Sequence, residues 1–402
     1  MRQELIQLEN MLQTLKKVEN ILQQPQNISD SLIYEVLNAV EDINANVFGC
    51  RKLLTVSFDE CIDNIVLFRE QYERWMKVLF DELQYRKTLP TKIDYDFHVF
   101  FSHIAAVSEE ELVEEAVACL KIIRKTHKTE YENIKRAYNA YRHFWGSLDL
   151  ENGDVTLIKK RIHEMKSHKE DFYWLYNNLA DYRSKKVLYG ILRHWLTFDY
   201  AHKNSIKENN FEDYYDFDIL NCDGEECLVD LGAYDGDSAQ SFIENFGVYK
   251  RIYCYEMTTS SMEKLQKRLE CFDNIVYRQV AVGNMNGSVH VADFEGDSSS
   301  NVVNPQGNKE IQRVRLDDDI SEPVTFIKMD IEGSELEALK GAERHIREDK
   351  PKLAVCTYHN NHHIYEVPRL MREYNPQYKL YMRYNGVWNS LLVSEFVTFA
   401  IP

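Results

Sequence analysis

The hydrophobic pattern divides the chain into a helical first half and a second half in which strands and helices alternate. In the first half, apolar residues recur every three or four positions, as on one face of a helix. The earliest such run predicts either the first helix of a bundle or a short dimerising zipper. Its seam consists of Leu8, Leu12, Leu15 and Leu22.

Further helices are indicated by start signals and by continued helical spacing. The sequence Ser-x-x-Glu occurs at 57–60 and at 108–111 and predicts capped helix starts, the second helix reaching about residue 143. Helical spacing returns over 156–166 and 170–198. Residues 91–105 are instead rich in aromatic and β-branched side chains and predict a strand or an irregular link.

From residue 226 the pattern changes to short apolar runs that alternate with amphipathic stretches. Strands are expected at 226–229, 251–256, 275–282, 324–330 and 352–358, and helices at 238–246, 259–271, 334–347 and 362–373. An insertion at 288–316 should add two further strands. Two closing strands, 378–384 and 391–400, have no helix between them and must pair antiparallel.

This order predicts an α/β fold: a class I methyltransferase Rossmann-like sheet with a terminal antiparallel hairpin, preceded by an all-helical N-terminal domain. We divide the chain into a helical domain (1–165), a helical brace and connection (166–225) and a methyltransferase domain (226–402). The apolar stripe of 172–196 predicts that the brace packs on the methyltransferase domain.

A glycine turn follows the first strand, in the run VDLGAYDGDS that begins at Val229. Strand, glycine turn and helix in this order place a ligand at the carboxyl end of a parallel sheet. Gly232 and Gly236 allow the backbone to approach a ligand, and Asp230, Asp235 and Asp237 surround the turn with negative charge. These acids would repel a pyrophosphate but suit a ligand with a cationic centre, and the nicotinamide fingerprint G-x-G-x-x-G is missing.

Carboxylates also end the second and fourth strands. Glu256 ends the second strand, where an acid can accept hydrogen bonds from both ribose hydroxyls of a nucleotide. Asp330 and Glu332 follow the fourth strand in KMDIEGSE, with Lys328 beside them, and Ser334 with Glu337 predicts another capping box.

His359 follows the fifth strand and is the predicted general base. Its ordinary pKa is close to neutrality, as a base that deprotonates a hydroxyl requires, whereas a carboxylate would need its pKa raised. Asp330 is then an orienting group, and Glu332 could take either role. The spacing of His359, His362 and His363 also resembles a metal site, but no carboxylate or cysteine stands at a matching spacing, so we predict no metal.

Composition narrows the class of protein. The 402 residues, 44% of them hydrophobic, allow two or three domains. No apolar run reaches the ~20 residues of a membrane span, and the amino terminus does not resemble a signal peptide. A net charge of −17 argues against non-specific binding to nucleic acid. The eight cysteines include no C-x-x-C pair, which favours a reduced, cytoplasmic protein over a zinc protein.

Together these motifs resemble the FkbM family of S-adenosylmethionine (SAM)-dependent methyltransferases. The resemblance covers about residues 170–402 and rests on VDLGAYDGDS, YCYEM, QVAVGNMNGSV, SSSN, VRLDDDI, IKMDIEGSELEALKGA and KPKLAVCTYH. It implies that the first turn and the second-strand acid hold SAM, although Met257 stands where the family usually has proline after that acid. The predicted cofactor contacts are Asp230, Gly232, Tyr234, Asp235, Gly236, Glu256 and Ala281.

The function predicted from this resemblance is O-methylation of a sugar, glycan or secondary-metabolite hydroxyl. The catalytic candidates are His359, Asp330 and Glu332. Two alternatives remain: a helical interaction protein whose cofactor domain is degenerate, and a nicotinamide-dependent oxidoreductase. The N-terminal helices are a candidate interface for a homo-oligomer.

Overall fold

A computed structural model describes residues 91–199, 205–207, 214–292, 302–303, 307, 309–385 and 395–402. The chain forms two compact units, which divide between Val99 and Phe100. The leucine seam, the helix start at 57–60, the SSSN loop and the candidate oligomer interface lie outside the described residues. The domain boundaries expected at 165 and 225 are not tested by this division and stay predictions.

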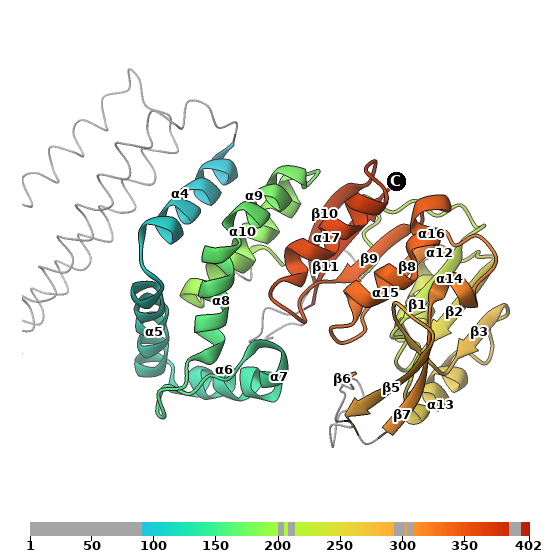
Figure 1. Cartoon of the computed structure of the whole chain (residues 1–402), viewed down its shortest axis with the longest axis horizontal. Coiled ribbons are helices and arrows are strands. Elements are labelled where there is room, and N and C mark those ends of the chain that lie inside the picture. The colour runs from blue at the N-terminus through green and yellow to red at the C-terminus, as the bar shows by residue number, and fades with distance from the viewer. Residues whose placement is uncertain are drawn as a thin grey trace, which may run out of the picture. The chain divides into compact units, whose positions relative to one another are not determined.

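The described part of the first half is helical. Its helices are α4 (Lys92–Ala106), α5 (Glu109–Thr126), α6 (Lys128–Ala140), α7 (Arg142–Trp145), α8 (Thr156–Ser167), α9 (Lys169–Asn178) and α10 (Tyr182–Thr197) (Figure 1). The strand or link predicted at 91–105 is wrong, because Phe97, Phe101 and Ile104 recur at helical spacing and outweigh the β propensity of their neighbours. None of the described helices is long and apolar enough to cross a membrane.

Two of the predicted long helices are interrupted. The capping box of Ser108 and Glu111 is present at the start of α5, but the helix ends at His127 rather than near residue 143. The polar run from Arg124 to Glu130 offers no side chain to the core, so the chain can turn there. The predicted helix at 170–198 breaks at Leu179, and the side chain of Asp181 accepts from Ser184 N to start α10.

The second half forms a seven-stranded sheet in the order β10-β11-β9-β8-β1-β2-β3. The strands are β1 (Cys227–Leu231), β2 (Arg251–Tyr255), β3 (Ile275–Arg278), β8 (Phe326–Met329), β9 (Lys352–Cys356), β10 (Lys379–Tyr384) and β11 (Phe396–Ile401). Five strands of this sheet run parallel: β1, β2, β3, β8 and β9. Strand β11 pairs antiparallel with both β9 and β10. The sheet is therefore Rossmann-like, as predicted.

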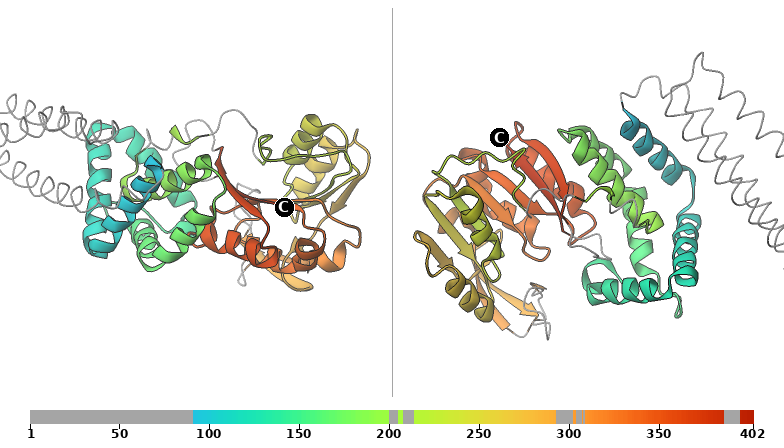
Figure 2. Two further views of the ribbon diagram at one scale, coloured as in Figure 1. Left: turned by 90° about the horizontal axis from the view of Figure 1, so that it is seen from above. Right: turned by 180° about the vertical axis from the view of Figure 1, so that it is seen from behind.

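Helices cover both faces of this sheet, so its central strands β1 and β8 are buried and apolar apart from Asp230 and Lys328. Figure 2 shows α12 and α13 on one face and α15, α16 and α17 on the other. Their bounds are α12 (Asp237–Phe246), α13 (Thr259–Arg268), α14 (Leu316–Asp319), α15 (Glu335–Gly341), α16 (Glu343–Glu348) and α17 (His363–Tyr374). Tyr215 and Phe242 pack with Leu228, Ile252 and Phe326 in the core between α12 and the sheet.

The insertion after β3 forms a second, four-stranded sheet in the order β4-β7-β5-β6. Its strands are β4 (Ala281–Val282), β5 (Gly287–Ala292), β6 (Val302–Val303) and β7 (Lys309–Val314). The single strand predicted at 275–282 is thus two strands in two sheets, because β4 leaves β2 and pairs with β7. This switch brings Ala281 to the ligand side of the main sheet.

The connection between α9 and α10 packs along the edge strand β10. Ala180 N donates to Leu380 O at 2.8 Å, and Met382 N donates to Ser184 Oγ at 2.9 Å. The buried Arg383 guanidinium contacts Asp181 at 2.8 Å and also pairs with Asp216. Backbone groups that an open edge strand would leave unpaired are therefore bonded to the helical region.

Candidate active site

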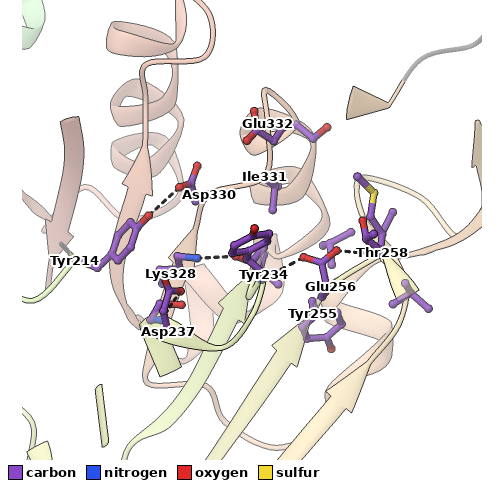
Figure 3. Close-up of a pocket in the computed structure, with 18 of the residues that line it drawn as sticks. Tyr214, Tyr234, Asp237, Tyr255, Glu256, Thr258, Lys328, Asp330, Ile331 and Glu332 are labelled. Carbon is purple, nitrogen blue, oxygen red and sulfur yellow. Dashed lines mark hydrogen bonds between the residues drawn. The ribbon is translucent and has the colours of Figure 1, made fainter. Parts of the chain in front are cut away.

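A cavity of about 570 Å³ lies at the carboxyl ends of β1, β2 and β8. Among the predicted site residues, its lining contains Gly232, Tyr234, Glu256, Ala281, Asp330 and Glu332 (Figure 3). Asp230, Asp235, Gly236 and His359 are not among the residues that line it. The cavity is at the edge of the sheet where the strand order predicted a ligand.

The glycine turn after β1 forms one wall of this cavity. Gly232 has a φ of +79°, and a Cβ placed there would lie 1.9 Å from the carbonyl oxygen of Asp330. Its N–H and that of Ala233 both donate to Tyr255 O at 3.0 Å, which ties the turn to the end of β2. Tyr234 also has a positive φ, of 45°, and so holds a conformation that is uncommon outside glycine. The turn therefore requires glycine at position 232.

Glu256 is held with its carboxylate at the cavity. Its Oε2 accepts from Tyr234 N at 3.2 Å and its Oε1 accepts from Thr258 N at 2.6 Å. Burial raises the pKa of Glu256, and these N–H donors oppose the rise. Each oxygen of a carboxylate has two lone pairs, so both can still accept from a ligand hydroxyl. This geometry fits the predicted contact to a ribose.

Asp230 lies beneath the turn rather than in the cavity. Its Oδ1 is 2.9 Å from Lys328 Nζ, its Oδ2 accepts from Ser238 Oγ at 2.6 Å, and both charged side chains are at most 3% exposed. Lys328 also donates to Gly232 O at 2.8 Å. Burial alone would lower the pKa of Lys328, but the Asp230 charge raises it, so the ammonium stays charged. The pair supports the turn from below.

Asp235 and Gly236 face away from the cavity, contrary to their predicted cofactor contact. The Asp235 carboxylate is 2.5 Å from Arg268 on α13, and Gly236 faces Leu265 and Leu269 of the same helix. Three residues that we did not predict as cofactor contacts, Asp237, Ser238 and Ser241, instead line the cavity, because α12 begins there.

Asp330 accepts from two tyrosine hydroxyl groups and lies near a histidine ring. Tyr214 donates to its Oδ2 at 2.8 Å and Tyr358 donates to its Oδ1 at 3.2 Å, while His359 Nε2 lies 3.5 Å from Oδ1. The Tyr214 ring also lies 4.9 Å from the Lys328 ammonium. Neither tyrosine could be predicted, because they come from the connection at 214–220 and from the residue before His359.

His359 is buried between carboxylates and is only 1% exposed. Its Nδ1 lies 2.9 Å from Glu335 Oε1, and its Nε2 lies 3.3 Å from Glu332 Oε2. Burial alone would lower the pKa of His359, but the Glu335 charge and the contact with Glu332 raise it well above 6.5. These carboxylates favour the protonated ring, which makes His359 less suited to the role of general base than the sequence suggested; that role stays a prediction.

Glu335 is a buried acid beside His359 that we did not predict as a site residue. It is fully buried, and its Oε1 accepts from Ile331 N at 3.2 Å and from Gly333 N at 3.3 Å. The predicted capping box is wrong: Ser334 forms no side-chain cap, and Glu337 pairs with Lys340 at 2.6 Å. The last acid of D-x-E-G-x-E, Glu335, closes the turn instead, so the motif itself was the available signal.

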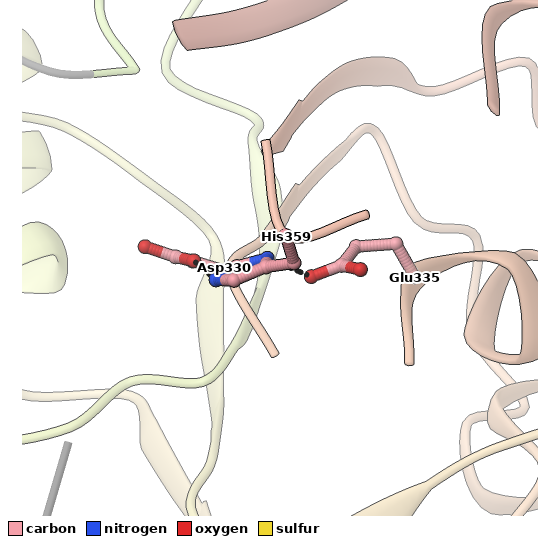
Figure 4. Close-up of side chains that lie close together, drawn as sticks. All are labelled: Asp330, Glu335 and His359. Carbon is pink, nitrogen blue, oxygen red and sulfur yellow. Dashed lines mark ion pairs between the residues drawn. The ribbon is translucent and has the colours of Figure 1, made fainter. Parts of the chain in front are cut away.

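The sequence predicted no metal at His359, His362 and His363, and the structure groups His359 with two acids instead. Oxygen and nitrogen atoms of Asp330, Glu335 and His359 do lie within 4.8 Å of one another. Figure 4 shows the His359 ring between the two acids, with Glu335 at Nδ1 and Asp330 at Nε2. One ion cannot bind both nitrogens of one ring, so this arrangement is better described as a chain of ion pairs.

The pair of His359 and Glu335 predicts a pH-dependent stability. The lowered pKa of Glu335 gives a contribution that is present above 4.5 and is lost as pH falls through the folded-state value. The raised pKa of His359 gives a contribution that is complete below 6.5 and is lost as pH rises through its folded-state value. The difference in free energy of unfolding between wild type and Glu335→Gln should therefore be largest between pH 4.5 and 6.5.

Urea unfolding at several pH values measures this difference. Glu337→Gln is the matched control, because Glu337 is on the same helix but 45% exposed. If the loss in free energy of unfolding caused by Glu335→Gln does not vary with pH, the protonation of Glu335 and His359 is not linked to folding.

Comparison with known proteins identifies the second half of the chain. Residues 230–378 match the family model described as the Methyltransferase FkbM domain. The chain contains an FkbM methyltransferase domain. The predicted resemblance is confirmed for these residues, while no curated protein matches the chain.

The FkbM domain has a similar solved structure. Methyltransferase FkbM from Methylobacillus flagellatus KT is 26% identical with a TM-score of 0.51, and the match covers 60% of this chain and 62% of that chain. The chain thus matches less than two thirds of that relative's length. Aeropyrum pernix fibrillarin in complex with SAM is 12% identical, with a TM-score of 0.28 and coverage of 44% and 67%. The similarity to the first of these structures agrees with a methyltransferase-like α/β fold.

Proposed function

We propose that the protein is a SAM-dependent O-methyltransferase that acts on a hydroxyl group of a sugar, a glycan or a secondary metabolite. The observation that carries this proposal is Glu256, whose carboxylate lines the cavity and accepts from Tyr234 N of the glycine turn and from Thr258 N. The FkbM domain match supports methyl transfer, and the hydroxyl acceptor is our inference from that family.

The residues at the cavity fit SAM in shape and in charge. Gly232 provides a wall in which any side chain would meet the carbonyl of Asp330. Asp237, Glu256, Asp330 and Glu332 line the cavity, and the charge of Lys328 is matched by Asp230. An excess of carboxylates favours a cationic ligand and disfavours the pyrophosphate of a nicotinamide cofactor.

When bound, SAM supplies a methyl group attached to positively charged sulfur. The chain must then hold an acceptor hydroxyl in line with that methyl group and remove its proton. Tyr214 and Tyr358 fix the carboxylate of Asp330 at the cavity edge, so Asp330 can orient a polar group. Cys254 and Cys356 are free and buried, which agrees with our proposal of a reducing, cytoplasmic location.

Glu256→Gln should weaken binding of S-adenosylhomocysteine (SAH) by about 1.5–3 kcal/mol, because it removes a charged acceptor of two hydroxyl hydrogen bonds. Titration calorimetry of the full chain measures this change. Glu263→Gln is the control, since Glu263 is an exposed acid on the following helix, α13. Equal affinity of wild type and Glu256→Gln would remove Glu256 from the cofactor site.

The same titration separates the alternatives. Binding of NAD in place of SAH would favour the oxidoreductase, and binding of neither would favour the interaction protein with a degenerate cofactor domain. Transfer of a labelled methyl group from SAM to a panel of methyl glycosides tests the acceptor class. A chain that binds SAH but methylates only non-hydroxyl acceptors would contradict the O-methylation.

A further inference from the structure

The O-methylation proposed above requires a group that takes the proton of the acceptor hydroxyl. Two carboxylates that follow β8 line the cavity, those of Asp330 and Glu332. They lie two residues apart but differ in their contacts, and this difference separates their roles.

Asp330 is already held by other side chains in this arrangement. Both of its oxygens face donors, namely the hydroxyl groups of Tyr214 and Tyr358, and His359 is close to Oδ1. Asp330 is therefore suited to orienting the acceptor.

Glu332 has the contacts expected of a base. Its side chain lines the cavity and its Oε2 faces His359 Nε2 at 3.3 Å. Burial raises the pKa of Glu332 above 4.5, although His359 opposes the rise, so its carboxylate is a stronger base than an ordinary glutamate. The residue also has a φ of 53°, a left-handed conformation that is uncommon outside glycine.

Glu335 contacts the His359 ring on the side opposite Glu332. Glu335 Oε1 lies 2.9 Å from His359 Nδ1 and also accepts from two backbone N–H groups of the turn that carries Glu332. Glu335 Oε2 is 3.2 Å from His363 Nδ1 on α17. His359 therefore lies between two carboxylates: the buried one of Glu335 and that of Glu332, which lines the cavity.

We propose that Glu332 accepts the proton of the acceptor hydroxyl, and that Glu335, acting through His359, positions Glu332 for this step. This inference rests on the proposed methyl transfer. The acceptor oxygen forms a bond to the methyl carbon, the electron pair of the broken carbon–sulfur bond stays on sulfur, and the acceptor proton passes to a carboxylate oxygen of Glu332. His359 remains protonated throughout and is a positioning residue.

Several charged or titratable groups face His359 and must be counted in any pH effect. Asp330 and Glu332 approach from the end of β8, Glu335 from α15, and His143 interacts with it from α7. The ring centroids of Tyr358 and Phe144 lie 4.1 and 5.3 Å from the centroid of the imidazole, and these rings shield it from water. Carboxylates thus outnumber histidines around the ring.

The first test requires no substitution and no acceptor. Nitrogen-15 NMR of the full-length wild type, with and without SAH, reports the protonation of each histidine as pH is raised. The His359 signals should stay those of an imidazolium beyond pH 6.5, the ordinary histidine value. Titration of His359 at its ordinary pKa would overturn the proposal even if SAH binds normally.

The second test uses variants, with the best methyl glycoside of the panel as the acceptor probe. Glu332→Gln should lower methyl transfer by about 10²- to 10⁴-fold while SAH affinity is unchanged. Glu335→Gln should move the ascending limb of the pH–rate profile to higher pH by about one unit, because Glu332 loses its cationic neighbour. Glu337→Gln, the exposed control on α15, should change neither quantity.

The outcomes distinguish this inference from the proposed function. Failure of the wild type to bind SAH contradicts the proposed function itself. Normal SAH binding with undiminished methyl transfer by Glu332→Gln contradicts only the assignment of the base. An unshifted pH–rate profile in Glu335→Gln contradicts the positioning role. If no glycoside is methylated, the NMR titration alone decides whether His359 is held as an imidazolium.

Discussion

Lys328→Met is expected to lower the free energy of unfolding by about 3–5 kcal/mol, because it leaves the Asp230 carboxylate buried without its cation. Lys328 and Asp230 are register partners on β8 and β1, and their side chains are 3% and 1% exposed. Water cannot reach the abandoned charge, and Ser238 supplies it with only one neutral donor. The carbonyl of Gly232 loses its donor at the same time.

Urea unfolding of the full chain, followed by circular dichroism, measures this loss. Lys340→Met is the matched control, since Lys340 pairs with Glu337 at 2.6 Å but is 47% exposed. An exposed pair of this kind contributes about 0–1 kcal/mol. A second substitution, Asp230→Asn, should recover part of the stability of Lys328→Met, because no uncompensated charge then remains. If the two lysine variants lose equal stability, the buried pair is not the support of the turn.

Gly232→Ala is expected to weaken SAH binding by about 1.5–3 kcal/mol, the magnitude of a lost hydrogen bond to a charged group. A Cβ at this position would lie 1.9 Å from Asp330 O, so the turn must move. Tyr234 N would then leave Glu256, whose carboxylate loses its alignment. The effect on binding is thus indirect and acts through the acid after β2.

Gly247→Ala separates this effect from the cost of the backbone conformation alone. Gly247 has a nearly equal φ of +76°, but no atom lies within 4 Å of a Cβ placed there. Both alanine variants should lose some stability, and only Gly232→Ala should lose SAH affinity in calorimetric titration. Equal SAH affinity of the two variants would mean that the turn does not position Glu256.

The main sheet and the place of the cavity could be predicted because their signals are local. The run Leu228–Leu231 is apolar apart from one aspartate, and Glu256 comes directly after another buried strand. Strand order then follows from the parallel connections, and the carboxyl ends meet at one edge. These inferences require no knowledge of which side chains touch.

The roles of individual acids could not be predicted, because they depend on partners distant in the sequence. Asp230 was expected at the cofactor, yet it pairs with Lys328, nearly a hundred residues away. His359 was expected to have an ordinary pKa, but burial lowers its pKa and the nearby carboxylates of Glu335 and Glu332 raise it. The D-x-E-G-x-E motif contains Glu335 but does not show that this acid is buried against His359, since the contact joins residues distant in the sequence.

The connection between α9 and α10 also affects whether the edge strand β10 can pair with another chain. An exposed edge strand is a template for pairing with a second sheet, which leads to fibrils or swapped assemblies. The backbone of Leu380 and Met382 on β10 is already bonded to Ala180 of the connection and to Ser184 of α10. A proteolytic fragment that began at residue 226 would expose this edge and leave Arg383 without Asp181 and Asp216. The connection and α10 therefore cover an edge strand that could otherwise pair with a second chain.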